Sequence, residues 1–397
     1  MSEIRVTNVL GENGNSPVNF TKGINMSGIV TATAFIPLQG QLSHRNIIIN
    51  GAMNVAQRAS SSTANGYGDL DRWKHEYVGT NENPTFAQAS LTTSDTPYTL
   101  GLTKTYKLTN GNQTSGLQAS SQINFNQQIE AQDIRNSGWN YKSSSSYITL
   151  SFWVRSSVSQ NFNGFVKTVD GSMYIYPYET GTLSANTWTK ITKSIPGNSN
   201  LQIDDDNGSG FQVFPIAIYG TNMTNNSVTY NQWAGWSSGG RSKDQANSWF
   251  TTNDATLEIT GVQLEVGPEA TPFEHRSFGE EKRLCMRYYQ QYINLQISGG
   301  YVPGTSNKAN QVTFTFPVEF RANPTASITT TGSSAGQYIY DGSGYANITA
   351  LDSAGILSTT CHMNFSLNGD LTNTRSVTLG GSTNTANQTT FKFTAEL

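Results

Sequence analysis

The sequence between residues 41 and 274 repeats one pattern, in which short runs of aromatic and β-branched residues alternate with turn residues. Such runs are typical of strands. The clear runs lie at residues 147–154 (YITLSFWV), 162–169, 173–178, 188–195, 211–219 and 255–266. Asp170 and Gly171, between the second and third runs, form a dipeptide common in hairpin turns. Many strands with little helix between them predict an all-β fold, an antiparallel sandwich.

The composition supports a packed β-structure and excludes some partners. Only 13% of the residues are charged and 11% are aromatic, whereas an ordinary soluble domain has about 25% charged residues. Disordered chains are poor in aromatic and β-branched residues, so we expect packed sheets with uncharged polar outer faces. A net charge of −3 provides no concentrated basic surface, so we expect no nucleic-acid partner. The start, MSEIRV, has no signal-peptide pattern and no apolar run approaches about 18 residues, so we expect neither secretion nor membrane insertion.

We divide the sequence into three parts. Residues 1–40 hold short segments that cannot bury a face alone, and we expect a β attachment or oligomerisation segment there. Residues 41–295 are predicted to form the sandwich, closed by one helix at 277–295. Residues 296–397 return to Ser/Thr/Gly-rich runs and predict a second, smaller β domain in a distal position.

The predicted helix has a clear beginning and an apolar stripe. Ser277 and Glu280 have the spacing of a capping box. Leu284, Tyr288 and Leu295 would share one face of a helix that continues to residue 295.

Three segments resemble a family of phage tail-fibre and receptor-binding proteins. They are RNIIINGAMNVAQR at 45–58 with LDRW at 70–73, LSFWVR at 150–155, and ITGVQLEVGPEATPFEHRSFGEEKRLCMRYY at 259–289. The resemblance implies a jelly-roll sandwich like that of carbohydrate-binding modules, carried on a virion appendage that is often a homotrimer. Residues 18–35 look like N-terminal pieces of other phage structural proteins, and FPVEFRANPT at 316–325 looks like the tip domains that follow this module.

The residues of these motifs mostly suggest structural roles. Trp73 is predicted to be a core aromatic at the start of a strand. Phe273 would plug the edge of the sandwich. Glu274 and Arg276 invite a catalytic interpretation, but a carboxylate near an arginine is more often an ion pair, and we predict an ion pair.

Nothing in the sequence indicates an enzyme. A glycan-cutting enzyme usually needs two carboxylates across the scissile bond, and acidic residues are sparse here. Cys285 and Cys361 have no zinc or redox spacing and are predicted to be free thiols. The four histidines are isolated in sequence and match no catalytic or metal motif: His44, His75, His275 and His362. We therefore expect no catalytic activity.

The densest acidic group lies in a Gly/Asn-rich loop. It consists of Asp204, Asp205 and Asp206, followed by Asn207. These side chains would be solvated, or their oxygens would hold a structural calcium ion. No other cofactor is expected.

Aromatic clusters are the candidate carbohydrate-binding surfaces. Tyr174, Tyr176 and Tyr178 would share one face of a strand, which Pro177 places at an edge. The alternative for this row is a half-buried position between sheets or subunits.

The second candidate is the loop-like run at 230–250, with Trp233, Trp236, Trp249 and Arg241. Tryptophans in loops favour recognition, although a trimer interface would use the same residues. In the distal domain, Tyr338, Tyr340 and Tyr345 form a third candidate surface.

These observations predict a non-enzymatic phage tail-fibre-type protein, located in the virion, that attaches to host-cell surface polysaccharide. We expect a homotrimer that contacts other virion tail or baseplate proteins through residues 1–40. Attachment would be weak at each site and strengthened by several copies. The alternatives are a polysaccharide depolymerase on the same scaffold and a purely structural fibre or decoration protein.

Overall fold

The computed structural model describes residues 43–304, 306–330, 337–342, 344–371, 376–381 and 388–397. The predicted attachment segment, 1–40, lies outside these residues. Within the described ranges, no helix is long and apolar enough to cross a membrane.

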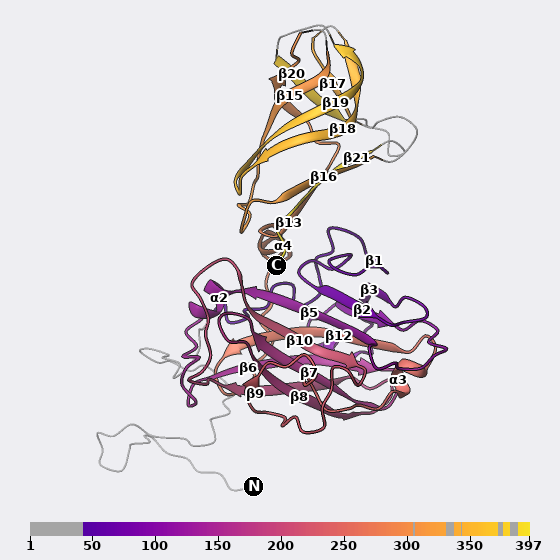
Figure 1. Ribbon diagram of the computed structural model, residues 1–397, viewed down its shortest axis with the longest axis vertical. Helices are drawn as coiled ribbons and strands as arrows, with labels where there is room; N and C mark the ends of the chain where they lie inside the picture. The colour runs from indigo at the N-terminus through magenta and orange to yellow at the C-terminus, as the bar shows by residue number, and fades with distance from the viewer. Residues whose placement is uncertain (1–42, 305, 331–336, 343, 372–375, 382–387) are drawn as a thin grey trace, which may run out of the picture. The chain divides into compact units, whose positions relative to one another are not determined.

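Two six-stranded sheets form a β-sandwich (Figure 1). The first sheet has the order β1 (Ser61–Ser62), β3 (Thr85–Ser90), β4 (Lys104–Thr109), β12 (Thr256–Val266), β6 (Tyr147–Ser156), β9 (Thr189–Pro196). The second has the order β11 (Ala234–Gly235), β8 (Tyr174–Leu183), β7 (Gln160–Thr168), β10 (Ser209–Tyr219), β5 (Gln122–Glu130), β2 (Lys74–Val78). Strands distant in sequence pair antiparallel, as β4 with β12 and β5 with β10. The prediction of an all-β antiparallel jelly roll is confirmed.

The sandwich is stabilised by one large hydrophobic core between the sheets. Trp73, Phe86, Phe152 and Phe162 are among its fully buried side chains. Each such side chain contributes on the order of 1.5–3 kcal/mol through removal from water. The indole N–H of Trp73 donates to the carbonyl of Asn50 at 3.1 Å, which satisfies its polar atom. Trp73 is therefore the core aromatic that the sequence predicted.

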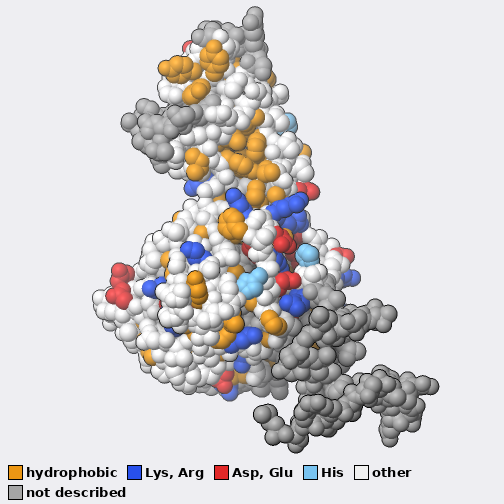
Figure 2. Space-filling view, turned by 180° about the vertical axis from the view of Figure 1, so that it is seen from behind, with side chains coloured by type: hydrophobic (Ala, Val, Ile, Leu, Met, Phe, Trp, Pro, Cys, Tyr) orange, Lys and Arg blue, Asp and Glu red, His pale blue; other side chains and the backbone are white. Residues whose placement is uncertain are grey.

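The outer surface is largely uncharged. Figure 2 shows that uncharged polar side chains and backbone cover most of the visible face, with acidic and basic groups scattered between them. This matches the low charged fraction of the sequence.

The short helices of the described chain are α1 (Thr96–Thr99), α2 (Ala131–Arg135), α3 (Ser248–Thr251) and α4 (Phe278–Met286). Helix α4 begins where predicted, because the Ser277 hydroxyl accepts a hydrogen bond from the Glu280 N–H at 3.2 Å.

The predicted end of this helix at residue 295 is wrong. Residues after Met286 leave the helix, and Tyr289–Ile293 forms strand β13. This strand pairs with β21 (Thr389–Thr394), so that Tyr289 lies opposite Thr394. The strand from the far end of the chain supplies the backbone hydrogen bonds, and Tyr and Ile are good strand residues. The apolar stripe through Tyr288 and Leu295 is therefore not a helix face.

The C-terminal part is β-rich, as predicted. A three-stranded sheet has the order β13, β21, β16 (Thr325–Thr330). A closed barrel follows the order β14 (Ile297–Tyr301), β15 (Ser306–Thr315), β19 (Thr360–Leu371), β18 (Tyr345–Ile356), β17 (Gln337–Tyr340), β20 (Ser376–Gly381). These strands surround a second hydrophobic core that includes Phe365 and Phe391. Cys285 and Cys361 are both buried free thiols.

Candidate functional site

The outer face of the second sheet carries a row of polar side chains. Gln212 on β10 lies directly opposite Gln128 on β5 and Lys167 on β7. On the next strand pair, Lys74 of β2 lies opposite Asn126 of β5. Directly opposed residues of antiparallel strands point to the same side of a sheet. The side chains therefore form a continuous polar surface across four strands. We call Asn126, Gln128 and Gln212 the amide row; Lys74 lies on one side of it and Lys167 on the other.

Aromatic side chains form the other part of this face. Phe165 and Phe214 are directly opposed and stacked, with ring centroids 4.2 Å apart. Tyr219 and Trp236 lie against Phe165, with centroids at 6.3 Å and 6.2 Å. Trp236 belongs to the loop after β11, and its backbone N–H donates to the carbonyl of Met173 at 2.9 Å. The loop thus holds one half-exposed indole above the sheet.

Two cations flank the Trp236 ring. The Lys167 ammonium lies 4.1 Å from the ring centroid, and the Arg241 guanidinium lies 5.2 Å from it. Both are in the range of cation–π interactions. Burial, and then the charge of Arg241, lower the pKa of Lys167. The two positive charges therefore repel each other at a partly buried position.

Together these residues line a groove of about 190 Å³, which we call the sheet groove. The groove is lined by the amide row, by the aromatic and cationic side chains described above, and by Lys74 and Glu76. The charged atoms of Lys74 and Glu76 lie 3.0 Å apart. Asn126 is 2% exposed, and its side-chain oxygen has no hydrogen-bond partner among the described residues. A buried acceptor without a partner is costly, so this oxygen is suited to a ligand donor.

Tyr176 and Tyr178 do not belong to a binding surface, and this prediction is wrong. Their exposed fractions are 3% and 0%, because their side of β8 faces the core of the sandwich. The Tyr178 hydroxyl donates to the carbonyls of Phe214 and Pro215, both at 3.1 Å, where β10 has a bulge. Tyr174 is half-buried and packs against the same core. The alternative prediction, that these three tyrosines are half-buried, therefore describes Tyr174 only.

The tryptophans of the 230–250 loop have different roles. Trp249 is fully buried in the core and its indole N–H donates to the Thr256 carbonyl at 3.1 Å, so its assignment to a binding surface is wrong. Trp233 packs edge-on against Tyr176 and donates to the Pro196 carbonyl at 2.7 Å. Of the residues predicted in this loop, Trp236 and Arg241 line the sheet groove.

The distal tyrosines lie on the outside of the barrel. Tyr340 is directly opposed to Tyr345, and these residues are 44% and 72% exposed. Tyr338 is half-buried, with its ring 5.9 Å from that of Tyr345. Their role in binding stays a prediction.

The sequence predictions missed most residues of the sheet groove. Lys74, Asn126, Gln128, Lys167 and Gln212 come from four strands, and no local motif connects them. The available signal was the alternation in INFNQQI at 123–129, where polar residues at every second position indicate an outward face.

The acidic loop residues are engaged in local contacts. The Asp204 N–H donates to Asp170 at 2.9 Å, Asp206 accepts from the Gly208 N–H at 2.8 Å, and Asp205 lies 3.9 Å from Arg135. Within the part of the chain that the structure describes, no group of three or more His, Cys, Asp or Glu side chains is arranged to hold a metal ion. The calcium hypothesis for Asp204, Asp205, Asp206 and Asn207 therefore rests on the sequence alone.

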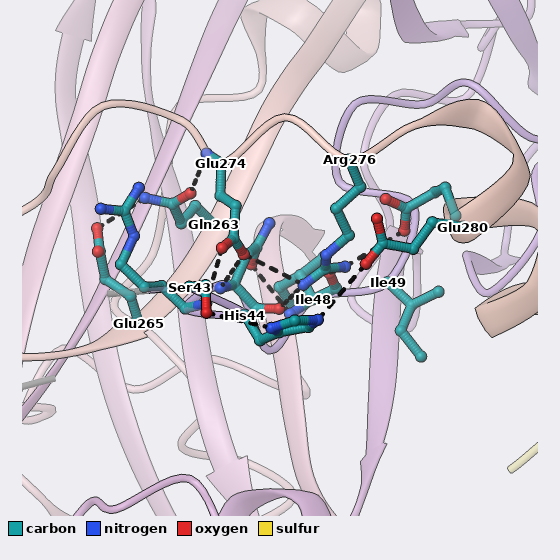
Figure 3. A network of polar contacts seen from close by, with 12 residues as sticks. Ser43, His44, Ile48, Ile49, Gln263, Glu265, Glu274, Arg276 and Glu280 are labelled. Atoms are coloured by element: carbon teal, nitrogen blue, oxygen red, sulfur yellow. Dashed lines mark hydrogen bonds and ion pairs between the residues drawn. The ribbon is translucent and has the colours of Figure 1, made fainter. Parts of the chain in front are cut away.

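Glu274 and Arg276 form the predicted ion pair, at 3.6 Å (Figure 3). Glu274 accepts hydrogen bonds from the N–H groups of Arg45 and Asn46 at 3.1 Å and 2.9 Å, and Arg276 donates to the Ile48 carbonyl at 3.1 Å. Burial acts to raise the Glu274 pKa, but these hydrogen bonds and the nearby arginines outweigh it and hold the pKa below its usual range. The pair fastens the segment before the first sheet to the segment after β12.

A buried His–Asp–Tyr cluster lies between the sheets. His75 Nδ1 is 3.0 Å from the oxygen of the Tyr106 hydroxyl, and this hydroxyl donates its proton to Asp69 at 3.2 Å. Burial lowers the pKa of His75 to about 4 and raises the pKa of Asp69 to about 6. Because these residues are at most 2% exposed, the cluster is a core network that a substrate cannot reach.

A second cavity, of about 490 Å³, lies on the outer face of the first sheet. Trp153, Phe273 and Leu102 form apolar walls, and Lys190, directly opposite Trp153, lies at its rim. Here Phe273 packs on the outer face of the interior strands β12 and β6, beside Gly261 and Trp153, so the predicted position at the edge of the sandwich is wrong. This cavity has less polar lining than the sheet groove and lacks its amide row.

Comparisons with known proteins assign no family. No protein-family model and no curated protein match the chain. Among solved structures, the tailspike protein 4 enzymatically active domain of bacteriophage CBA120 is similar at 10% identity and a TM-score of 0.31; the match covers 56% of this chain and 21% of that one. A putative sugar-binding protein from Bacteroides thetaiotaomicron has 12% identity and a TM-score of 0.30, over 56% of this chain and 100% of that one. A family 11 carbohydrate-binding module from Clostridium thermocellum has 10% identity and a TM-score of 0.24, over 53% and 98%.

Proposed function

We propose that the protein is a non-enzymatic glycan-binding protein whose ligand lies in the sheet groove. The observation that carries this proposal is the position of Trp236 beside the amide row, with the Asn126 oxygen unpartnered among the described residues. An indole face stacks on the apolar face of a sugar ring, while amides both donate to and accept from hydroxyl groups. A few convergent polar groups next to an aromatic surface are typical of small-ligand sites.

Binding without catalysis is supported by the charges of the groove. Among the described residues that line it, Glu76 is the only carboxylate, and it is paired with Lys74 at 3.0 Å. Glycoside hydrolysis ordinarily uses two carboxyl groups about 5–10 Å apart on either side of the scissile bond. A depolymerase on this scaffold would have to place its acid and base elsewhere.

We further propose that the protein belongs to a phage virion appendage, that it assembles as a homotrimer, and that it attaches the particle to host polysaccharide. The support for this is the sequence resemblance at 45–58, 150–155 and 259–289. Three copies of a small groove would strengthen a weak individual affinity.

The test is calorimetric titration of the full chain with a panel of soluble polysaccharides, neutral and acidic. We expect at least one to bind, and Trp236→Ala to weaken its affinity by at least about tenfold, as for a buried aromatic anchor. Trp153→Ala removes an indole from the other sheet and should leave affinity unchanged. If no polysaccharide binds, or if only Trp153→Ala weakens binding, the sheet groove is not the site. Release of reducing ends from the bound polysaccharide would instead support the depolymerase.

A further inference from the structure

The charges of the sheet groove differ from those of the whole chain. The chain has a net charge of −3, whereas the groove is lined by three cations, Lys74, Lys167 and Arg241, and one carboxylate, Glu76. Lys74 and Glu76 neutralise each other at 3.0 Å. The groove therefore keeps the positive charges of Lys167 and Arg241.

Within the described part of the chain neither cation has a carboxylate at ion-pair distance, although the more distant charge of Glu76 partly offsets the effects that lower the pKa of Lys167. Arg241 has one side-chain hydrogen bond there, to the Gln122 amide oxygen at 3.5 Å, and its buried Nε has no partner. Lys167 is directed at the Trp236 ring, 4.1 Å from its centroid. Two like charges brought together at a half-buried position are unfavourable unless an anion binds between them. In the protein without ligand, the repulsion between Lys167 and Arg241 is therefore not relieved.

We propose that the ligand of the sheet groove is an acidic glycan: its uronic acid carboxylate binds Arg241 and Lys167 in place of the Trp236 ring, and its sugar ring stacks on the indole face that these cations release. This inference rests on the proposed function, because it names the class of glycan for the same site. A guanidinium binds a carboxylate through two parallel hydrogen bonds, and such charge-assisted bonds are stronger than those between neutral groups. The amide row then contacts hydroxyl groups of the same or the adjacent sugar.

Single-stranded nucleic acid is the other anion that combines with aromatic and cationic side chains. Its binding sites follow the backbone with a basic groove and several stacking aromatics, one for each successive base. The sheet groove has one half-exposed indole, since Phe165, Phe214 and Tyr219 are each at most 8% exposed. The geometry therefore favours a single stacked sugar ring with one carboxylate.

The experiment compares matched acidic and neutral ligands with the full chain. The acidic members of the panel are alginate, polygalacturonate and hyaluronan, and each is paired with its own carboxyl-reduced form; dextran and a single-stranded oligonucleotide complete the set. We expect an acidic member to bind at least about tenfold more tightly than its reduced form. The affinity should fall as NaCl is raised from 50 to 500 mM, because the salt screens the ionic contact.

Charge variants assign the effect to the groove. Lys167→Gln and Arg241→Gln should each remove most of the preference for the acidic form, and Lys167→Arg should restore it. Lys190→Gln is the matched control, since Lys190 is an exposed cation opposite Trp153 on the other sheet. Thermal unfolding of each variant, compared with the unmodified protein, verifies folding.

The outcomes separate this inference from the proposed function. If the reduced or neutral glycans bind as tightly as the acidic ones and Trp236→Ala abolishes binding, the groove binds glycans, but the inference that its ligand is acidic is overturned. If the oligonucleotide alone binds, or no ligand binds, both proposals are overturned. If Lys190→Gln alone removes the preference, the acidic ligand lies on the other sheet and the inference fails.

Discussion

Arg72 and Glu396 form a buried ion pair between positions 324 residues apart in sequence. Their side chains are 1% and 6% exposed. Arg58 pairs with the other oxygen of the Glu396 carboxylate at 2.9 Å, and the Arg72 guanidinium lies 3.4 Å from the ring centroid of Tyr288. The chain end after β21 is thereby fastened to the segment that leads into β2.

Replacing Glu396 should destabilise the protein strongly. Glu396→Gln keeps the shape of the side chain but leaves Arg72 buried without its counter-charge. Removing one member of a buried ion pair costs about 3–5 kcal/mol. We expect a loss of about 3 kcal/mol in the free energy of unfolding, measured by urea denaturation. Asp352→Asn is the control, because its pair with Lys308 is more exposed and should cost less than about 1 kcal/mol. Equal losses for the two variants would contradict the buried-pair interpretation.

Tyr178→Phe should destabilise the second sheet without opening a cavity. The variant keeps the ring and removes the hydroxyl that donates to the Phe214 and Pro215 carbonyls at the β10 bulge. A lost buried hydrogen bond of this kind costs about 1–2 kcal/mol in the free energy of unfolding. Tyr340→Phe, at a 44% exposed position, should change it by less than about 0.5 kcal/mol. The assignment of Tyr178 as a structural residue fails if both variants unfold at the same urea concentration.

The sequence was sufficient for the fold class and for the strands that are rich in aromatic and aliphatic residues. The runs predicted at 147–154, 211–219 and 255–266 are β6, β10 and β12, which are buried along most of their length. The helix end was mispredicted because the residues from Tyr289 onward satisfy a helical pattern locally. Their partner, β21, lies about 100 residues away, and no local pattern reveals it.

The candidate site was less predictable for a related reason. Trp236 and Arg241 were found because tryptophan in a Gly/Ser-rich loop is locally conspicuous. Tyr178 and Trp249 belong to the same two predicted aromatic clusters, yet they point into the core. Which aromatic faces outward depends on the register between strands, and Lys167, Gln212 and Gln128 become neighbours only through that register.

His75 should make stability depend on pH. It is fully buried, stacks on Phe86 with centroids 4.0 Å apart, and has a pKa lowered by burial from 6.5 to about 4. The unfolded chain takes up a proton on His75 below pH 6.5, while the folded protein does so only near pH 4. Stability from this group is therefore present above pH 6.5 and is lost as the pH falls toward 4. The loss is on the order of 3 kcal/mol.

The measurement is the free energy of unfolding in urea at several pH values between 4 and 7. His75→Gln should be less stable than the unmodified protein at pH 7, because it loses the buried stacking on Phe86. It should also lack the pH-dependent contribution of His75, so the difference in free energy of unfolding between the two proteins should shrink as the pH falls. Asp69, 3.6 Å from His75, has a raised pKa and acts in the opposite direction, but it is present in both proteins. His275→Gln, at an exposed position, should follow the pH dependence of the unmodified protein. A constant difference between His75→Gln and the unmodified protein would contradict the prediction.

A substitution of Gly51 tests whether the 45–58 motif serves to pack its segment against strand β12 of the sandwich. Its carbonyl accepts a hydrogen bond from the Val262 N–H at 3.0 Å, and a Cβ at residue 51 would lie 2.1 Å from the Val262 carbonyl oxygen. Since that obstacle is backbone, Gly51→Ala must separate the 45–58 segment from β12. We expect a loss of at least about 2 kcal/mol in the free energy of unfolding, the magnitude of a core overpacking. Gly279→Ala in α4 meets nothing within 4 Å and should be neutral or up to about 1 kcal/mol stabilising, because alanine favours helix. If Gly51→Ala instead unfolds like the unmodified protein but loses glycan binding, the motif serves the ligand and not the packing of the two segments.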